Sequence, residues 1–158
     1  MTKGKLITTL PILEKSYFVS FEMKPTSLPG GYHNILHFTI GGDIGKYGER
    51  TPAVWSNGNS LHVCSAVSGN ANYCQDIHNF IKINEWFSLN ISQQLTNGKY
   101  MYKIETNGTV FHEVENKEPA TFDNVEVYVS NPWYPANPGS IRKIIVGTGT
   151  DIDIDTGT

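Results

Sequence analysis

Charged residues are scarce in this chain, and segments with helical patterning are absent. Only 17% of the 158 residues are charged, and no segment of a dozen residues spaces its apolar side chains as an amphipathic helix does. No apolar run approaches the roughly 18 residues that a membrane-spanning helix requires. These absences argue against a coiled coil and against membrane insertion, and they leave short strands as the expected secondary structure.

An excess of basic charge is also lacking. The formal net charge is −3, and Asp151, Asp153 and Asp155 supply the whole imbalance, because residues 1–150 carry 12 basic and 12 acidic side chains. Binding to a phosphate backbone or to an anionic membrane surface needs a basic patch. We therefore expect neither nucleic acid nor a membrane as a partner.

Several motifs of chemistry and targeting are missing. The sequence has no Gly-x-Ser-x-Gly elbow, no P-loop and no dinucleotide fingerprint. Its first residues, Met1 to Lys5, lack the apolar core of a signal peptide. That start indicates either synthesis in the cytosol or a leader that has been removed, and the sequence leaves both alternatives open.

Turn signals between short alternating segments are what the chain does have. Asn57-Gly58, Asn97-Gly98 and Asn107-Gly108 favour type I′ turns, which join antiparallel strands in hairpins. Residues 41–51 and the proline-rich residues 131–139 are predicted loops, and residues 65–83 are predicted to be irregular after a strand that ends at Cys64. Alternation of apolar and polar residues predicts strands at 5–9 before a break at Pro11, and at 16–24, 33–40, 53–56, 60–64, 86–92, 100–105, 125–129 and 140–146. A further strand is predicted after Asn107-Gly108, ending at Val114.

About ten short strands, each with one apolar face, need two sheets that cover each other's apolar sides. The predicted fold is therefore all-β, a two-sheet antiparallel β-sandwich of the jelly-roll type. Residues 1–150 are expected to form this single domain. Residues 151–158 are expected to form either an acidic C-terminal tail or an extra edge strand.

Two cysteines and two sequons point to an extracellular setting. Cys64 and Cys74 bracket a stretch of small polar residues, typical of an exposed loop, and a disulfide between them would join neighbouring strands. The alternative is two separate buried thiols. Asn90-Ile91-Ser92 and Asn107-Gly108-Thr109 fit the N-glycosylation signal, so Asn90 and Asn107 are candidate glycosylation sites.

Two segments resemble laminin-G-like members of the concanavalin-A-like jelly-roll superfamily. Residues 84–93, Asn-Glu-Trp-Phe-Ser-Leu-Asn-Ile-Ser-Gln, are similar to the family's strand that opens with a tryptophan, and residues 139–146, Gly-Ser-Ile-Arg-Lys-Ile-Ile-Val, are similar to its closing strand. The order of elements fits from about residue 5 to residue 147, although Ser140 stands where these modules commonly have a cysteine. The resemblance implies an extracellular binding or adhesion module that uses loops or one sheet face.

Aromatic residues in loops are the best candidates for ligand contact. Trp133 and Tyr134 lie in a loop that its prolines stiffen, so ordering them on binding costs little entropy, and aromatic rings suit a sugar or a protein surface. The alternative for Trp133 is that it folds back and caps one end of the sandwich. The predicted ligand-binding residues are Trp133, Tyr134 and Asn131, together with Asn57 and Trp55.

Calcium is the one cofactor that the sequence suggests. Asp43 and Glu49 lie in a glycine-rich loop, whose carbonyl oxygens can turn toward a hard cation; the alternative is a turn-forming Asp43 and a surface ion pair between Glu49 and Arg50. Zinc is not expected. His33 and His37 would lie about 13 Å apart along one strand, and we expect structural roles for all five histidines.

The function that we expect is non-catalytic recognition of a glycan or an extracellular protein by loops at one end of the sandwich. The first alternative is a glycan-cleaving enzyme on the same fold, which would need two carboxylates in one cleft. The second is a structural matrix protein that self-associates through sheet edges.

Overall fold

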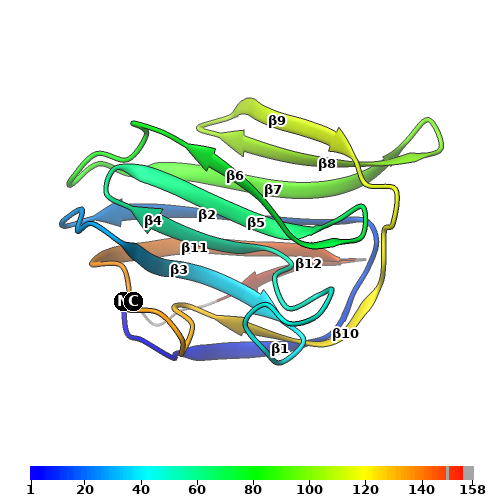
Figure 1. Cartoon of the computed structure of the whole chain (residues 1–158), viewed down its shortest axis with the longest axis horizontal. Coiled ribbons are helices and arrows are strands. Elements are labelled where there is room, and N and C mark those ends of the chain that lie inside the picture. Colours follow the sequence, from blue (N-terminus) through cyan, green and yellow to red (C-terminus); the bar gives the residue numbers. More distant parts are fainter. Residues whose placement is uncertain (149, 155–158) are drawn as a thin grey trace.

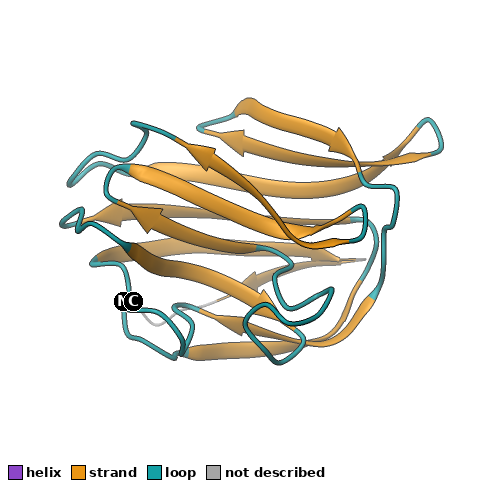
Figure 2. Ribbon diagram, in the orientation of Figure 1, coloured by secondary structure: helices purple, strands orange, loops and turns teal. Residues whose placement is uncertain are grey.

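Twelve strands and no helix make up the part of the chain that the computed structural model describes, residues 1–148 and 150–154 (Figure 2). No described helix is therefore long and apolar enough to cross a membrane. The strands are β1 (Leu6–Leu13), β2 (Tyr17–Pro25), β3 (Tyr32–Thr39), β4 (Ala53–Asn57), β5 (Ser60–Val67), β6 (Asn70–Ile77), β7 (Phe87–Thr96), β8 (Lys99–Thr106), β9 (Thr109–Glu115), β10 (Phe122–Tyr128), β11 (Gly139–Thr148) and β12 (Thr150–Ile154).

The strands form two antiparallel sheets that pack face to face. Sheet A has the order β1-β10-β3-β4-β5-β6, and sheet B has the order β12-β11-β2-β7-β8-β9. In Figure 1, the strands β3 to β6 of sheet A lie in front of β2, β7 and β11 of sheet B. The chain repeatedly crosses between the sheets, as at β1 to β2 to β3 and β9 to β10 to β11. The prediction of an all-β jelly-roll sandwich is confirmed.

The core lies between the sheets, and the alternating strands supply it. In β2, Tyr17, Val19, Phe21 and Met23 are buried, while the residues between them are half-buried. β7 is paired with β2 and repeats this pattern. Each fully buried side chain of this size stabilises the fold by about 1.5–3 kcal/mol. Alternation thus locates the core of sheet B correctly.

The Asn-Gly pairs do not all form the same turn. Asn97-Gly98 and Asn107-Gly108 have positive φ at both residues, as a type I′ turn requires, and they connect β7 to β8 and β8 to β9. Asn57 instead ends β4, and only Gly58 of that pair has a positive φ. Ser68-Gly69 is a further turn with two positive φ values, and it joins β5 to β6.

Three sequence predictions about strands were wrong. Pro11 does not end the first strand, because β1 is an edge strand of sheet A and proline is tolerated where no ladder hydrogen bond is needed. Residues 65–83 are not irregular throughout, because β6 occupies Asn70–Ile77. In β3 a register shift between Asn34 and Leu36 interrupts the alternation, so that Ile35 and Leu36 are both fully buried.

The acidic segment begins as a strand. Residues 150–154 form β12 and pair with β11 at the edge of sheet B, which corresponds to the edge-strand alternative for this segment. Residues 155–158 lie outside the described residues.

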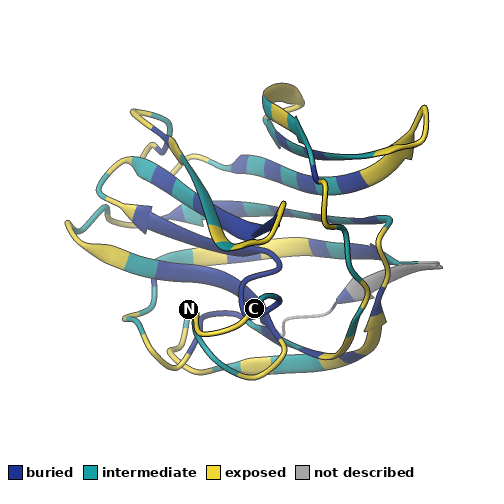
Figure 3. Cartoon of the chain, turned by 45° about the vertical axis from the view of Figure 1, so that its right-hand side comes forward, coloured by how far each residue is buried: buried dark blue, intermediate teal, exposed yellow. Residues whose placement is uncertain are grey.

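Both faces of the strands in the middle of sheet A are covered. β3 is buried from Asn34 to Thr39, and β4 from Ala53 to Ser56; Figure 3 shows the corresponding dark blue stretches. One face of a sheet in a two-layer sandwich normally remains open to solvent. Something other than sheet B must therefore cover the outer face of sheet A.

Candidate functional site

A small second cluster of buried side chains lies on the outer face of sheet A. Ala53, Trp55 and Cys64 form it, with Cys74 and Tyr134 packed against them. It is separate from the main core, to which the neighbouring Val54 belongs, as expected when successive side chains point to opposite faces of a sheet. Trp55 is only 1% exposed, so the outer face carries a packed aromatic centre rather than an open surface.

The loop between β10 and β11 covers one side of this centre. Its anchor is Asn131, which is fully buried. The Asn131 side-chain oxygen accepts hydrogen bonds from the backbone N–H of Trp133 (3.0 Å) and of Tyr134 (2.9 Å). The rings of Tyr134 and Trp55 then meet edge to face, with centroids 5.6 Å apart. Asn131 therefore shapes the loop and is not available to a ligand, which corrects its predicted role as a contact residue.

A buried histidine ties this loop to the loop between β3 and β4. His37 Nε2 donates to the backbone oxygen of Glu49 at 2.6 Å, and its Nδ1 accepts from Asn131 Nδ2 at 2.8 Å. One neutral tautomer satisfies both contacts. Burial lowers the pKa of His37 to about 4, so the imidazole is uncharged at neutral pH. His37 also contacts the rings of Trp55 and Trp133.

Arg50 closes another side of the aromatic centre. Its guanidinium pairs with Asp43 (Nη2 to Oδ1, 3.0 Å) and donates to Asn72 (Nη1 to Oδ1, 2.7 Å). The same group lies over the ring of Trp55, 4.4 Å from its centroid, which is cation–π geometry. Arg50 is 5% exposed and pairs with Asp43, so the alternative of a surface ion pair between Glu49 and Arg50 does not describe this loop.

These groups surround a pocket of about 260 Å³ on the outer face of sheet A. Its walls come from β3, β4, β5, β6 and two loops, which lie far apart in the sequence. Its lining residues are Tyr32, Ile44, Arg50, Trp55, His62, Asn72 and Tyr134. The indole N–H of Trp55 is buried and has no hydrogen-bond partner among the described residues. A buried water is one partner that would satisfy such an atom.

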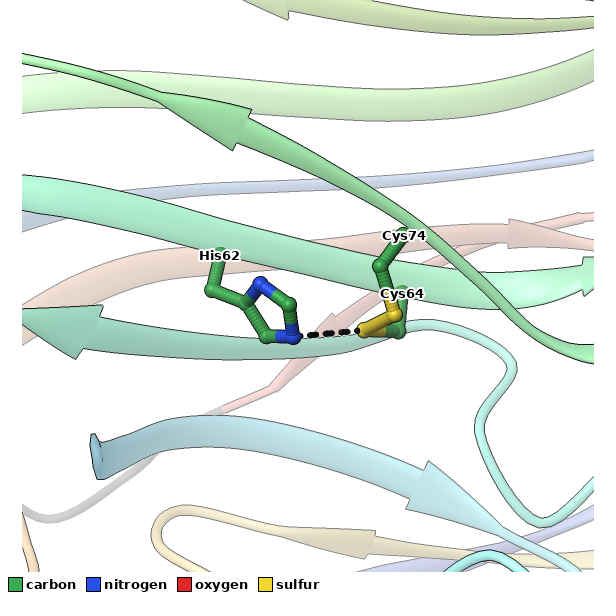
Figure 4. A group of neighbouring side chains, drawn as sticks. All are labelled: His62, Cys64 and Cys74. Carbon is green, nitrogen blue, oxygen red and sulfur yellow. Dashed lines mark hydrogen bonds between the residues drawn. A yellow bond between two sulfur atoms is a disulfide. The ribbon is translucent and has the colours of Figure 1, made fainter.

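The disulfide lies at the edge of this pocket. Cys64 and Cys74 are bonded, as predicted. The segment between them is not an open loop, because the two cysteines lie directly opposite each other on the paired strands β5 and β6. His62 lies two residues before Cys64 on the same face, with Nε2 3.2 Å from Cys64 Sγ (Figure 4). Its Nδ1 contacts Asp76 Oδ1 at 2.7 Å.

The structure brings together only some of the predicted ligand-binding residues. Trp55 and Tyr134 share the pocket, although Trp55 is buried and is not an exposed loop residue. Trp133 is 39% exposed and packs against His37 and Tyr128 beside the pocket. Asn57 is exposed where β4 ends, and it accepts a hydrogen bond from the Gly31 N–H. Asn57 does not line the pocket.

The two predicted calcium ligands have partners inside the protein. The Asp43 carboxylate faces Arg50, and the Glu49 carboxylate, on a residue only 8% exposed, accepts the backbone N–H of Lys46 at 2.7 Å. Within the described chain, neither belongs to a cluster of three acidic, histidine or cysteine side chains. Calcium binding at this loop stays a prediction.

The two sequons occupy different environments. Asn107 is exposed in a hairpin turn, where its side-chain oxygen accepts the Ser88 N–H at 2.9 Å. Asn90 is half-buried in the middle of sheet B, between Ser20 on β2 and Glu105 on β8. Glycosylation at either residue stays a prediction, and Asn107 is the more accessible of the two.

Two other hollows have different linings: the first has Phe21 as its one aromatic residue, and the second combines Phe80, Trp86 and Phe87 with four polar side chains. One, of about 320 Å³ on the outer face of sheet B, contains Glu22 and Glu105. A hydrogen bond from Arg142 lowers the pKa of Glu22, the opposite of what a general acid needs. Strand β7 separates the two strands that carry these glutamates, which puts them about 10 Å apart. The other, of about 300 Å³, lies beside Trp86.

Sequence reasoning missed Arg50, His62 and Asn72 as site residues. Arg50 lies in the loop between β3 and β4, and Asn72 lies on β6, a strand in the segment that was predicted to be irregular. Nothing in the sequence therefore showed that the two residues meet. For His62 one signal was available: His62 and Cys64 are two residues apart in a predicted strand, and they must therefore share a face.

Comparisons with known proteins identify the fold. Domain 4 of an extracellular arabinanase from Geobacillus stearothermophilus, solved with arabinotriose, is 19% identical, with 93% of this chain and 67% of that chain covered and a TM-score of 0.59. A double variant of human galectin-16 is 15% identical over 94% and 100% of the chains, with a TM-score of 0.57. An SAP-like pentraxin from Limulus polyphemus is 11% identical over 89% and 67%, with a TM-score of 0.59.

This chain has the concanavalin-A-like jelly-roll fold. No family model and no curated protein sequence matches it. Identities below 20% show similarity of fold and not of activity. The narrower likeness to laminin-G modules therefore stays a prediction.

Proposed function

We propose that this protein is a non-catalytic glycan-binding module whose ligand occupies the pocket on the outer face of sheet A. The observation that carries the proposal is the convergence there of Tyr32, Trp55 and Tyr134 with the polar side chains of Arg50 and Asn72. A sugar ring has apolar C–H faces and a rim of hydroxyl groups. Aromatic walls with a few fixed polar groups are the matching surface.

The pocket is already organised for binding. Asn131 and His37 hold the Tyr134 loop, while Asp43 and Asn72 hold the guanidinium of Arg50. Side chains that are fixed before the ligand arrives lose little entropy on binding. A rigid site of about 260 Å³ suits one or two sugar residues, and a longer chain would extend along the sheet.

The charges around the pocket favour an uncharged glycan. Arg50 is paired with Asp43, and His62 contacts Asp76. An anionic sugar would have to compete with Asp43 for the guanidinium, whereas a neutral sugar can use the remaining N–H groups without separating the pair. Hydrogen bonds from a charged donor are about twice as strong as neutral ones.

The setting that we propose is extracellular, with adhesion to a glycan-bearing surface as the role. The disulfide supports this, because such bonds persist in oxidising compartments. The arabinanase domain supports it as well, since that enzyme is extracellular and its domain 4 was solved with arabinotriose.

Binding fits the pocket better than cleavage does. None of its described lining residues is an aspartate or a glutamate, and hydrolysis of a glycosidic bond uses a pair of carboxylates. Self-association through the edge strands β1, β6, β9 and β12 stays a prediction that sedimentation can check.

The test is a glycan array followed by titration of the best ligand, with and without a calcium chelator. Tyr32→Ala and Tyr134→Ala each should weaken binding at least tenfold, which corresponds to about 1.4 kcal/mol. Phe111→Ala is the matched control, because Phe111 and Tyr32 are both 44% exposed but Phe111 lies on β9, outside the pocket. The control should bind like the wild type.

Equal affinity of the Tyr32→Ala, Tyr134→Ala and Phe111→Ala proteins, all folded by circular dichroism, would overturn the proposed site. Binding that the chelator abolishes would instead favour a calcium-dependent site and direct attention to Asp43 and Glu49. Release of shorter glycans during the titration would support the enzyme alternative.

A further inference from the structure

The side chains at the disulfide form a complete set of metal ligands once the S–S bond is reduced. We propose that the reduced protein binds Zn²⁺ through His62 Nε2, Cys64 Sγ and Cys74 Sγ. These three atoms all lie within 4.8 Å of one another, and Figure 4 shows the imidazole directed at the two sulfur atoms. This site does not depend on the glycan-binding proposal.

The present spacing is close to what tetrahedral zinc requires. With Zn–S bonds of about 2.3 Å and a Zn–N bond of about 2.0 Å, neighbouring ligand atoms lie about 3.5–3.8 Å apart. His62 Nε2 is already 3.2 Å from Cys64 Sγ. Reduction separates the two sulfurs from bonding distance to van der Waals distance, which is the separation that the metal needs. Small rotations of the side chains complete the site.

The backbone keeps the ligands together without the S–S bond. His62 and Cys64 are on β5, and β6 pairs with β5 from Leu61–Ile77 to Val67–Asn70. Cys64 and Cys74 are therefore direct cross-strand partners whose Cα atoms are 4.1 Å apart. A hydrogen-bonded ladder of this length sets the register of all three residues.

Asp76 completes the set as the partner of the ligand histidine. Its Oδ1 lies 2.7 Å from His62 Nδ1, and it is opposite His62 in the β5–β6 register. When Nδ1 donates its proton to a carboxylate, the lone pair of the neutral ring is on Nε2, the atom that faces the sulfurs. Zinc-ligating histidines commonly have such a carboxylate behind them.

The site is open on the solvent side and is balanced in charge. His62 and Cys74 are half-buried, and Cys64 is buried, so a fourth position remains for water or an added ligand. Two thiolates and a neutral imidazole around Zn²⁺ have no net charge. The guanidinium of Arg50, with Nη1 4.0 Å from Cys64 Sγ, partly offsets the charge of the thiolates before metal arrives.

The chemistry requires an external two-electron reductant: a dithiol, or a phosphine together with water, which supplies the oxygen of the phosphine oxide and the two thiol protons. A dithiol transfers two electrons and two protons to the disulfide, gives Cys64–SH and Cys74–SH, and becomes a cyclic disulfide itself. Zinc binding then forms two Zn–S bonds and releases the two thiol protons. The oxidised protein has no thiolate and therefore should not bind zinc here.

The experiment is a Co²⁺ and Zn²⁺ titration of the full chain, reduced with a phosphine under argon. The reduced wild-type protein should take up one Co²⁺ per chain, with the visible spectrum of a tetrahedral site and a thiolate charge-transfer band, and Zn²⁺ should displace it. The oxidised protein and the Cys64→Ser, Cys74→Ser double variant should show neither band.

His62→Gln and Asp76→Asn separate this site from adventitious binding by two thiols. Both variants keep the cysteines. Asp76→Asn should weaken zinc binding about 10- to 100-fold, the usual effect of losing a histidine's carboxylate partner, and His62→Gln should weaken it further. His78→Gln is the control, because His78 is exposed and lies outside the ligand cluster.

Equal zinc affinity of the reduced wild-type, His62→Gln and His78→Gln proteins would overturn the proposal. So would a reduced protein that loses its β-sheet circular dichroism and does not recover it with zinc. A melting temperature of the reduced protein that rises with zinc only when His62 is present would support it.

Discussion

Acid should destabilise this protein through a single buried imidazole. His37 is fully buried on β3, between the backbone oxygen of Glu49, the amide of Asn131 and the rings of two tryptophans. Burial lowers its pKa from 6.5 to about 4, while Asp43 acts to raise that pKa and Arg50 to lower it. In the neutral ring, Nδ1 accepts a hydrogen bond from the side-chain amide of Asn131. Protonation would place a hydrogen on Nδ1, so that two N–H groups would face each other there.

The sign and size follow from linkage. Between pH 6.5 and 4 the unfolded chain binds a proton at His37 and the folded chain does not, so the free energy of unfolding falls as the pH falls. Each pH unit in this window costs about 1.4 kcal/mol. The loss is about 2 kcal/mol at pH 5 and about 3 kcal/mol at pH 4, and it levels off at about 3.4 kcal/mol below pH 4. Above pH 6.5 the contribution is constant.

Urea unfolding at pH 7.5 and pH 5.0 measures this, with wild-type protein and with His37→Gln. The variant loses hydrogen bonds at both pH values, so the informative quantity is the difference between the two drops in stability. The wild-type drop should exceed the variant drop by about 2 kcal/mol, because the carboxylates contribute alike to both proteins. Equal drops, or an NMR titration that places the His37 pKa above 6, would refute the reasoning.

Two further predictions concern the disulfide and one glycine of β11. Replacing both Cys64 and Cys74 by Ser should lower the free energy of unfolding by about 3 kcal/mol, the loop-closure value for a sequence separation of 10, and oxidised samples in urea will show whether it does. Gly139→Ala should cost at least about 2 kcal/mol, because Gly139 has a φ of +154° and its Cβ would lie 2.5 Å from the Lys24 oxygen. Gly30→Ala, which meets nothing within 4 Å, should stay within about 0.5 kcal/mol of wild type; equal melting temperatures for these two glycine variants would contradict the prediction.

The parts of the fold that sequence patterns predicted were the local ones. Asn97-Gly98 and Asn107-Gly108 form the turns that their chemistry favours, and the alternation in β2 and β7 marks the core face. β6 was missed because small polar residues and two asparagines give an edge strand no apolar alternation to detect. The alternation predicted for β3 was wrong because the strand has a bulge at residue 35. A bulge is a change of backbone pairing, and no residue type at that position indicates it.

The candidate site was predictable only where one segment carried it. Tyr134 stood out in a proline-stiffened loop, and the two cysteines of the disulfide could be paired because they were the only two. Asn131 was taken for a contact because the sequence does not show that its amide is needed to hold the turn. The residues around Trp55 come from five strands and loops, and no local rule relates their positions.

By itself, the sequence determined an all-β sandwich and the core face of its alternating strands, because turn propensity and alternation act over a few residues. The two cysteines were compatible with a disulfide or with two separate thiols, and the pairing of β5 with β6 decided for the disulfide. The tertiary structure decided that Trp55 is buried on the outer face, that Arg50 pairs with Asp43, and that His62 faces the sulfur atoms. These arrangements depend on which strands become neighbours and in what register, and strand pairing joins residues that are distant in the chain. The pocket exists because two loops return to one sheet face and bring their side chains together there.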